Sequence, residues 1–147
     1  MANSDYPSGF TVAGHKGGGV ARAAAFQIDQ SYATALFCGD AVTIASGYIN
    51  KAANDSSAII GVFDGCTYVD GSNNLMFSRY WPGVSLADVA KIVTAFVYVD
   101  PDILYEVQTD TGTASTIASL GVSYDIELDH AVFWRAVHTG VLRLYAD

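Results

Sequence analysis

Hydrophobic and polar positions follow a short-period pattern along most of the chain. From residue 23 onward, runs rich in Val, Ile, Phe, Tyr and Thr are separated by clusters of Gly, Asp, Asn and Ser. Short runs of β-branched and aromatic residues bounded by such clusters are typical of strands. We therefore predict an all-β fold with strands at residues 24–28, 41–45, 58–68, 75–80, 91–99, 104–108, 123–128, 132–137 and 141–145.

Three polar clusters predict the turns between these strands. Residues 70–74 read Asp-Gly-Ser-Asn-Asn and stand between two strand-like runs, which indicates a hairpin. Residues 100–102 read Asp-Pro-Asp, and their proline excludes a central strand position because it lacks a donor N–H. Residues 109–112 (Thr-Asp-Thr-Gly) predict a third turn.

Helix signals are weak by comparison. Ser85 and Asp88 have the spacing of a capping box, but the β-branched and aromatic run at residues 92–99 favours a strand soon afterwards. Residues 31–37 are a second place where a short helical turn fits. We expect no more than one helical turn at either position.

Two of the runs are apolar at every position rather than at alternate positions. Residues 58–63 read Ala-Ile-Ile-Gly-Val-Phe, and residues 132–134 read Val-Phe-Trp. A sheet with one solvated face alternates, so such runs indicate strands that are covered on both faces. We expect a small β-barrel or sandwich, or a surface that another subunit covers.

The first 22 residues differ from the rest in glycine content. Five glycines stand between residues 9 and 19, and large side chains are few. Glycine loses the most backbone entropy on ordering, so this composition favours a flexible arm. We expect an arm at residues 1–22, with Phe10 and Val12 as its apolar side chains, followed by one domain at residues 23–147.

The charge balance narrows the range of partners. Seven Lys and Arg residues face 15 Asp and Glu residues in 147 positions, which gives a net charge of −8, and charged residues are only 15% of the chain. An average soluble domain has about 25%. Clustered basic residues are needed to bind phosphates or anionic lipids, so neither nucleic acid nor a membrane is an expected partner.

The chain contains no apolar run long enough for a transmembrane helix, and its first residues lack the features of a signal peptide. Synthesis in a reducing cytoplasm is therefore the expectation. Cys38 and Cys66, the two cysteines, are expected to be buried free thiols.

Known catalytic and metal-binding patterns do not fit the sequence. Residues 14–19 hold glycines and Lys16, but a phosphate-binding loop needs a Gly-Lys-Ser/Thr sequence that opens a helix. No Gly-x-Ser-x-Gly elbow occurs, and the histidines have no zinc-like spacing with the cysteines; they are His15, His130 and His138.

Acidic residues are plentiful, but most of them stand in turn sequences. Thirteen of the 15 are Asp, commonly next to Gly, Pro, Asn or Ser. A calcium site near Asp100 and Asp102 lacks the alternating acidic loop, and no pair of carboxylates stands out as the acid and base of a glycosidase. We expect no enzyme activity, no cofactor and no metal.

The aromatic residues offer a different kind of site. The chain has 9 Tyr, 7 Phe and 2 Trp, and residues 77–83 read Phe-Ser-Arg-Tyr-Trp-Pro-Gly. Tyr, Trp and Arg are enriched at binding hot spots, so a subunit contact is one interpretation of this run. The other is a strand end that places a Trp in the core. The candidate binding residues here are Arg79, Tyr80, Trp81 and Pro82.

An ordered series of short motifs gives the sequence a family resemblance. They are residues 2–5 (Ala-Asn-Ser-Asp), 7–10 (Pro-Ser-Gly-Phe), 47–49 (Gly-Tyr-Ile), 60–68 (Ile-Gly-Val-Phe-Asp-Gly-Cys-Thr-Tyr), 77–82, 100–101 and 105–108 (Tyr-Glu-Val-Gln). In this order they resemble a family of small structural proteins of tailed bacteriophages, which includes the capsid decoration, or cement, proteins of podovirus-like heads. The resemblance covers about residues 1–110 and departs from the family pattern at residues 115–147.

The resemblance implies a protein of the virion, made in the host bacterial cytoplasm, that binds the exterior of the phage head. Its partner would be the major capsid protein, and it would be a homo-oligomer, with a trimer favoured over a dimer. The glycine-rich arm would dock on the capsid, since an extended segment can add a strand to a neighbouring sheet. The alternatives are another virion component, such as a head-fibre base, a tail part or a host-glycan-binding module, and a small β-barrel enzyme or unrelated binding module.

Overall fold

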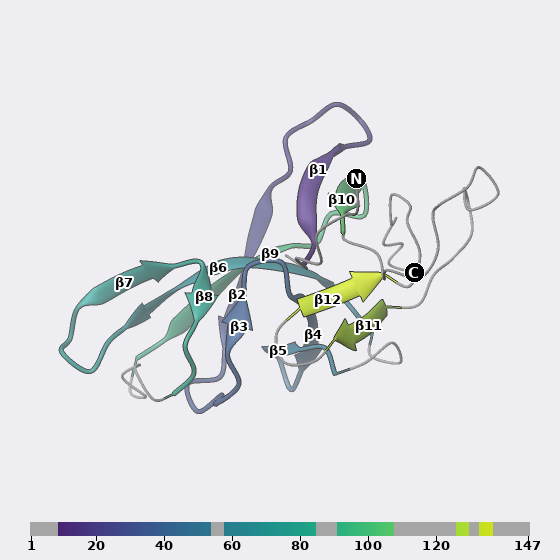
Figure 1. The fold of residues 1–147 in the computed structure, drawn as a ribbon. Helices are drawn as coiled ribbons and strands as arrows, with labels where there is room; N and C mark the ends of the chain where they lie inside the picture. The colour runs from purple at the N-terminus through teal and green to yellow at the C-terminus, as the bar shows by residue number, and fades with distance from the viewer. Residues whose placement is uncertain (1–8, 54–57, 85–90, 108–125, 130–132, 137–147) are drawn as a thin grey trace, which may run out of the picture.

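The computed structural model describes residues 9–53, 58–84, 91–107, 126–129 and 133–136, which form strands and turns but no helix. The prediction of an all-β fold is therefore confirmed (Figure 1). None of the described residues belongs to a helix that could cross a membrane. The strands are β1 (Thr11–His15), β2 (Ala23–Ile28), β3 (Leu36–Phe37), β4 (Ala41–Ala45), β5 (Tyr48–Lys51), β6 (Gly61–Val69), β7 (Leu75–Ser78), β8 (Tyr80–Trp81), β9 (Val93–Tyr98), β10 (Ile103–Glu106), β11 (Ile126–Asp129) and β12 (Phe133–Ala136).

The main sheet has the strand order β2-β9-β6-β4-β5, and β7 pairs with the outer half of β6. Three two-stranded ladders accompany it, β1 with β10, β3 with β8 and β11 with β12, and every pairing is antiparallel. Strands β2 and β5 approach each other without pairing. The described strands therefore form a sandwich-like arrangement, and no ladder among them closes it into a barrel.

Strand β6 is covered on both faces, as its sequence predicts. Phe63 lies in a core cluster on one side, while the adjacent Val62 lies in a second cluster on the other. Successive side chains of a strand point to opposite faces, so a run that is apolar at every position can serve two cores. The larger core is built around Trp81, and the smaller one around Tyr105.

Part of the predicted arm is integral to the fold. Phe10 is only 3% exposed and packs edge-on against Tyr105, and Thr11–His15 form β1, which pairs with β10. Burial of a phenyl ring and a strand ladder together offset the entropy that the neighbouring glycines lose. Residues 1–8 of the predicted arm lie outside the described residues.

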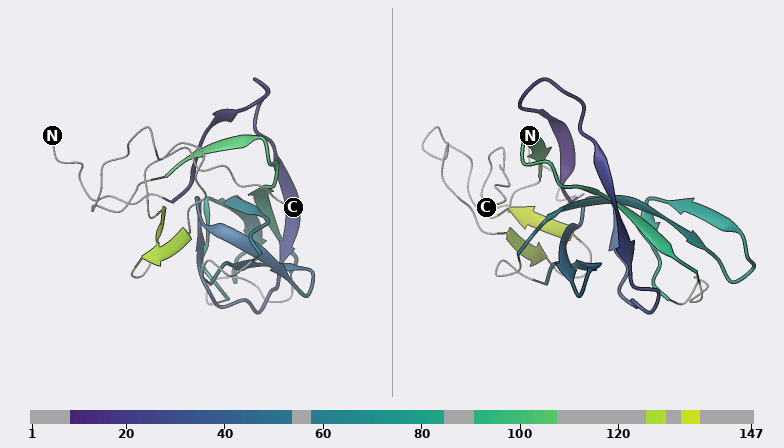
Figure 2. Two further views of the ribbon diagram at one scale, coloured as in Figure 1. Left: turned by 90° about the vertical axis from the view of Figure 1, so that its right-hand side faces the viewer. Right: turned by 180° about the vertical axis from the view of Figure 1, so that it is seen from behind.

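The hairpin predicted at residues 70–74 is confirmed. Asp70 accepts hydrogen bonds from the backbone N–H groups of Ser72 and Asn74, and Asn73 has the positive φ of 63° that such a turn requires. The β6–β7 hairpin extends away from the rest of the fold (Figures 1 and 2). The turn at residues 100–102 is also present, with Asp102 donating its backbone N–H to Asp100.

One further prediction was wrong, and three others fall on residues that the structure does not describe. Residues 31–37, where a helical turn was expected, end instead in β3, because Leu36 and Phe37 pair with Trp81 and Tyr80. The strand predicted at residues 141–145, the turn at 109–112 and the capping box at 85–88 lie outside the described residues.

Candidate functional site

The six residues predicted to bind a partner have very different exposures. Phe10 and Trp81 are core residues, while Val12 and Pro82 are half-buried. Arg79 and Tyr80 are exposed, and the Tyr80 ring stacks on Phe37 with 5.8 Å between ring centroids. Phe10 and Trp81 therefore stabilise the fold rather than offer a surface.

Trp81 has the second of its two predicted roles, that of a core residue at a strand end. Its side chain is 0% exposed, its ring packs edge-on against Tyr68, and its Nε1–H donates to the backbone oxygen of Tyr32 at 3.0 Å. A buried Trp whose N–H has a partner is fully accommodated. Its ring is therefore unavailable to another protein.

Three of the six predicted residues meet at one small cavity. The cavity has a volume of about 210 Å³, and its lining residues are Phe10, Thr11, Val12, Cys38, Val62, Phe63, Asp64, Arg79 and Tyr98. Two ladders bring them together. Strand β1 carries Val12 opposite Tyr105 of β10, and the backbone N–H of Cys38 donates to the Arg79 oxygen beside the β3–β8 pair.

The polar side of the cavity is a contact among Arg79, Cys38 and Asp64. The Arg79 Nη2 lies 2.9 Å from the Cys38 Sγ and 3.5 Å from an Asp64 carboxylate oxygen. The Cys38 Sγ lies 3.7 Å from the same oxygen. Asp64 stands at an irregularity of β6, where the register against β9 shifts between Phe63 and Gly65. A bulge of this kind re-aims a side chain, which here points to the cavity.

Burial raises the pKa of two ionisable groups that line the cavity. Burial raises the pKa of the Cys38 thiol, and its contact with Arg79 offsets part of that rise. Burial also raises the pKa of Tyr98, and the nearby Asp64 carboxylate adds to the effect. A thiol with a raised pKa is mostly protonated at neutral pH and is a weak nucleophile. The cavity therefore combines an apolar floor with a charged rim.

A buried ion pair supports the loop that carries Cys38. Asp40 is 2% exposed, accepts the backbone N–H of Phe37 at 2.9 Å, and lies 3.0 Å from the Lys51 Nζ. A buried carboxylate needs such partners because its desolvation is costly. The pattern of the sequence did not single out this pair, since Asp40 stands next to glycine as a turn residue does.

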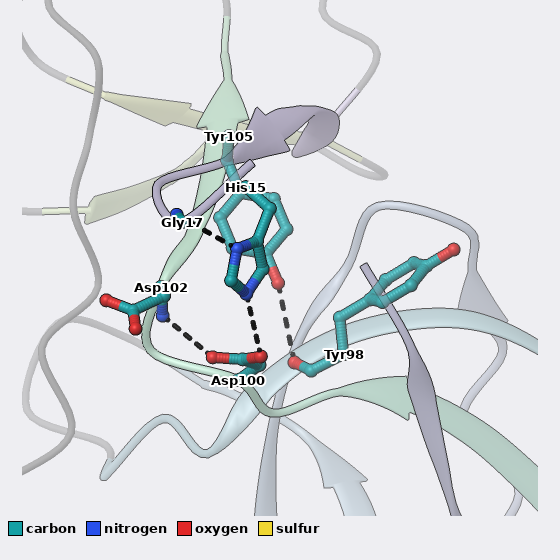
Figure 3. Close-up of polar contacts among 6 residues, drawn as sticks. All are labelled: His15, Gly17, Tyr98, Asp100, Asp102 and Tyr105. Atoms are coloured by element: carbon teal, nitrogen blue, oxygen red, sulfur yellow. Dashed lines mark hydrogen bonds and ion pairs between the residues drawn. The ribbon is translucent and has the colours of Figure 1, made fainter. Parts of the chain in front are cut away.

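A second polar contact joins β1 to the turn between β9 and β10 (Figure 3). The His15 Nδ1 accepts the backbone N–H of Gly17 at 3.1 Å, and its Nε2 lies 3.1 Å from an Asp100 carboxylate oxygen. Because an amide N–H can only donate, this network assigns the ring proton to Nε2, which donates to Asp100. Both ring nitrogens are engaged, so this pair fastens a turn and leaves no free base.

This contact predicts an acid-sensitive contribution to stability. The backbone N–H of Asp102 and the His15 ring lower the pKa of Asp100. A carboxylate with a lowered folded-state pKa stabilises the fold above its unfolded-state pKa, about 3.9, and the contribution is lost as the pH falls through the lower value. Asp100→Asn should therefore weaken the decline in unfolding free energy on acidification, as measured by urea denaturation from pH 6 to pH 2.5.

The matched control for this experiment is Asp102→Asn. Asp102 stands two residues away in the same turn, and its described contacts use its backbone. It should keep the wild-type dependence on pH. If Asp100→Asn and the wild-type protein lose stability equally on acidification, the Asp100 carboxylate makes no pH-dependent contribution to stability.

The sequence favoured a solvated turn over a calcium site near Asp100 and Asp102, and the described residues there form a turn. The Asp100 carboxylate binds His15 and its own turn. Across the part of the chain that the structure describes, no three His, Cys, Asp or Glu side chains lie together as metal ligands would.

A run of exposed apolar side chains lies on β7, and the sequence analysis singled out only one of them, Phe77, in the aromatic run of residues 77–83. Leu75, Met76 and Phe77 are 61%, 39% and 75% exposed. The signal was present in the sequence: residues 71–78 contain three large apolar side chains in succession and no charge. The sequence analysis interpreted such apolar runs as covered strands at residues 58–63 and 132–134, but the three apolar side chains of β7 are exposed.

The sequence was compared with models of protein families, with curated proteins and with solved structures, and none of them matches it.

Proposed function

We propose that this chain is a structural protein of a tailed-phage virion that decorates the head, binding the major capsid protein on the outer surface and bridging its subunits. The sequence motifs described above suggest the family, and the observation that carries the proposal is the cavity where Phe10, Val12 and Arg79 meet. Its volume of about 210 Å³ is below the roughly 300–1,000 Å³ of small-molecule sites. It is better suited to one side chain projecting from a protein surface.

The chemistry of the cavity fits such a contact. The Arg79 side chain is 79% exposed at the rim, and Asp64 is 34% exposed beside it, so a partner can reach both charges. Arginine next to an apolar pocket is a common arrangement at binding hot spots. Many copies bound around the head would each hold neighbouring capsid subunits together, and binding only the closed shell would stabilise it by mass action.

The test uses heads of the phage that encodes this chain, prepared without it. Adding purified protein should raise the temperature at which the heads open, and electron microscopy should show new density on the outer surface. Arg79→Glu should weaken binding to heads at least tenfold, which corresponds to about 1.4 kcal/mol. It should leave the fold nearly unchanged, because exposed ion pairs contribute about 0–1 kcal/mol.

Lys91→Glu is the control, because it changes the charge equally at an exposed residue away from the cavity. It should bind heads as the wild-type protein does. Heads that gain neither density nor thermal stability would contradict the proposal. Binding at the tail or to host cells would indicate a different virion component, such as a glycan-binding module.

A further inference from the structure

Strand β7 combines three properties that seldom occur together in a native edge strand. It pairs with β6 along one edge, and no described strand pairs with its other edge. Its side chains are exposed and apolar, and residues 71–78 carry no charge. Soluble proteins normally protect such an edge with Lys, Pro or a bulge, because an unpaired apolar edge invites another strand. Strand β7 itself contains no Lys and no Pro, and its pairing with β6 has no bulge.

The register of the hairpin shows how the side chains of β7 are distributed between its faces. Met76 stands opposite Tyr68, which is buried beside Trp81, so Met76 faces the core side. Leu75 and Phe77 stand opposite Val69 and Thr67 and therefore point to the other face. That outer face presents the two most exposed side chains of the strand.

We propose that two copies of this chain pair through their β7 edges, antiparallel and about a two-fold axis. The pairing joins the two main sheets through β6, β7 and their counterparts into one continuous sheet. With Met76 opposite Met76 of the second copy, Leu75 of each copy stands opposite Phe77 of the other on the outer face. Cross-strand pairs of this kind, aromatic against aliphatic, each contribute roughly 0.2–1 kcal/mol.

A second copy fits this edge because the edge is self-complementary. An isologous two-fold contact requires that residue i meet residue j and that j meet i. An antiparallel pairing centred on Met76 satisfies this with apolar residues on both sides. A partner of another kind would have to supply a matching apolar edge, whereas a second copy already carries one.

The charges at the two ends of β7 favour the same antiparallel arrangement. Asp70 stands at the turn end of the hairpin, and Arg79 follows the other end of the strand. In the proposed register Arg79 of each copy lies opposite Asn73 of the other, in the turn that begins at Asp70. Two chains that each carry a charge of −8 repel one another in most orientations. In this register Arg79 of each copy approaches the turn that contains Asp70 of the other, so charges of opposite sign lie at both ends of the contact.

The Arg79 side chain still has hydrogen-bond donors for the second copy. Its two described hydrogen bonds, to Cys38 and Asp64, both use Nη2. A guanidinium group has five N–H donors, so others remain for a carboxylate or a carbonyl oxygen of the second copy. The side chain is also largely exposed.

This inference deepens the proposed function, on which its biological use rests, by assigning β7 to a second copy and the cavity to the capsid, with Arg79 at the border between the two contacts. It also departs from the trimer that the sequence resemblance favours, because a two-fold pairing closes at two copies. The pairing can be measured without phage heads, so its failure and that of the proposed function are distinguishable.

The experiment is sedimentation equilibrium of the purified full-length protein over a range of concentrations. The wild-type chain should give twice its mass of 15.5 kDa. Phe77→Lys, which puts a charge on the outer face of the edge, should weaken self-association at least tenfold and give the mass of a single chain. Its circular dichroism spectrum should match that of the wild-type protein, since Phe77 is 75% exposed and its replacement leaves the core intact.

Ile92→Lys is the matched control, because Ile92 is 66% exposed and lies outside β7. It should remain a dimer. A wild-type protein that is a monomer at all concentrations, a trimer, or a dimer that Phe77→Lys leaves intact would overturn the proposal. A Phe77→Lys protein that is monomeric but still binds heads would support β7 pairing as a contact separate from the cavity.

Discussion

Replacing Trp81 by alanine is expected to lower the free energy of unfolding by about 3–5 kcal/mol, the range seen for large aromatic residues removed from protein cores. Trp81 is the largest fully buried side chain among the residues whose burial the structure describes, and it contacts Tyr68 in the larger core. Its removal leaves a cavity and also leaves the backbone oxygen of Tyr32 without its Nε1–H donor. Both the cavity and the lost hydrogen bond lower the free energy of unfolding.

Equilibrium denaturation in urea, followed by circular dichroism, measures this effect. Tyr80→Ala is the control, because Tyr80 is the preceding residue of β8 and is 40% exposed. It should cost about 1 kcal/mol, mostly from the lost stacking on Phe37. A Trp81→Ala protein that loses no more than Tyr80→Ala would contradict a core role for Trp81. Trp81→Phe, which keeps most of the volume, should recover part of the loss.

Replacing Gly61 by alanine is expected to cost about 3 kcal/mol or more, although only one methyl group is added. An added Cβ would overlap the backbone oxygen of Tyr98 and lie 3.0 Å from a methyl group of Val97. The obstacle is the backbone of β9, which pairs with β6 and cannot move aside as a flexible side chain does. Overpacking in a rigid core commonly costs 1–3 kcal/mol, and a backbone clash at the central strand places this variant at or above that range.

The control for Gly61→Ala is Gly71→Ala, in the turn of the β6–β7 hairpin. A Cβ at Gly71 meets nothing within 4 Å, so the same chemical change should alter the unfolding free energy by no more than about 1 kcal/mol. Thermal and urea denaturation of both variants give the comparison. Equal stability of the two variants would show that β6 and β9 do not approach as closely as their pairing requires.

The pattern of the sequence predicted most strands because their signal is local. Strand β4 has the predicted bounds, and β2 differs from its prediction by one residue. The turns at Asp70 and Asp100 were equally visible, since a short side chain that bonds its own backbone needs no distant partner. The burial of residues 61–63 in β6 also followed from the apolar run at residues 58–63, although residues 58–60 precede the strand and are not buried.

The missed strands β1, β3 and β5 show where a local signal ends. Strand β1 contains a glycine and follows another, and it is held by a ladder with β10, about 90 residues away in the sequence. Strand β3 has two residues, which is too short for any periodicity. Strand β5 could have been predicted from the sequence, because the dipeptide Ser46-Gly47 is a turn signal directly after a strand-forming run. In the structure both residues have the positive φ of a tight hairpin turn.

At the candidate site, too, some features followed from the sequence and others only from the tertiary structure. The sequence by itself determined the strand-forming runs, the acidic charge and the residue types at the site, because composition and short-range periodicity are written along the chain. Only the tertiary structure decided that Phe10 and Trp81 are buried, that Arg79 meets Cys38 41 residues away, and that β7 is left at an open edge. The physical reason is that burial and contact between distant residues depend on the order of strands in the sheet, and strand order is a property of the whole chain.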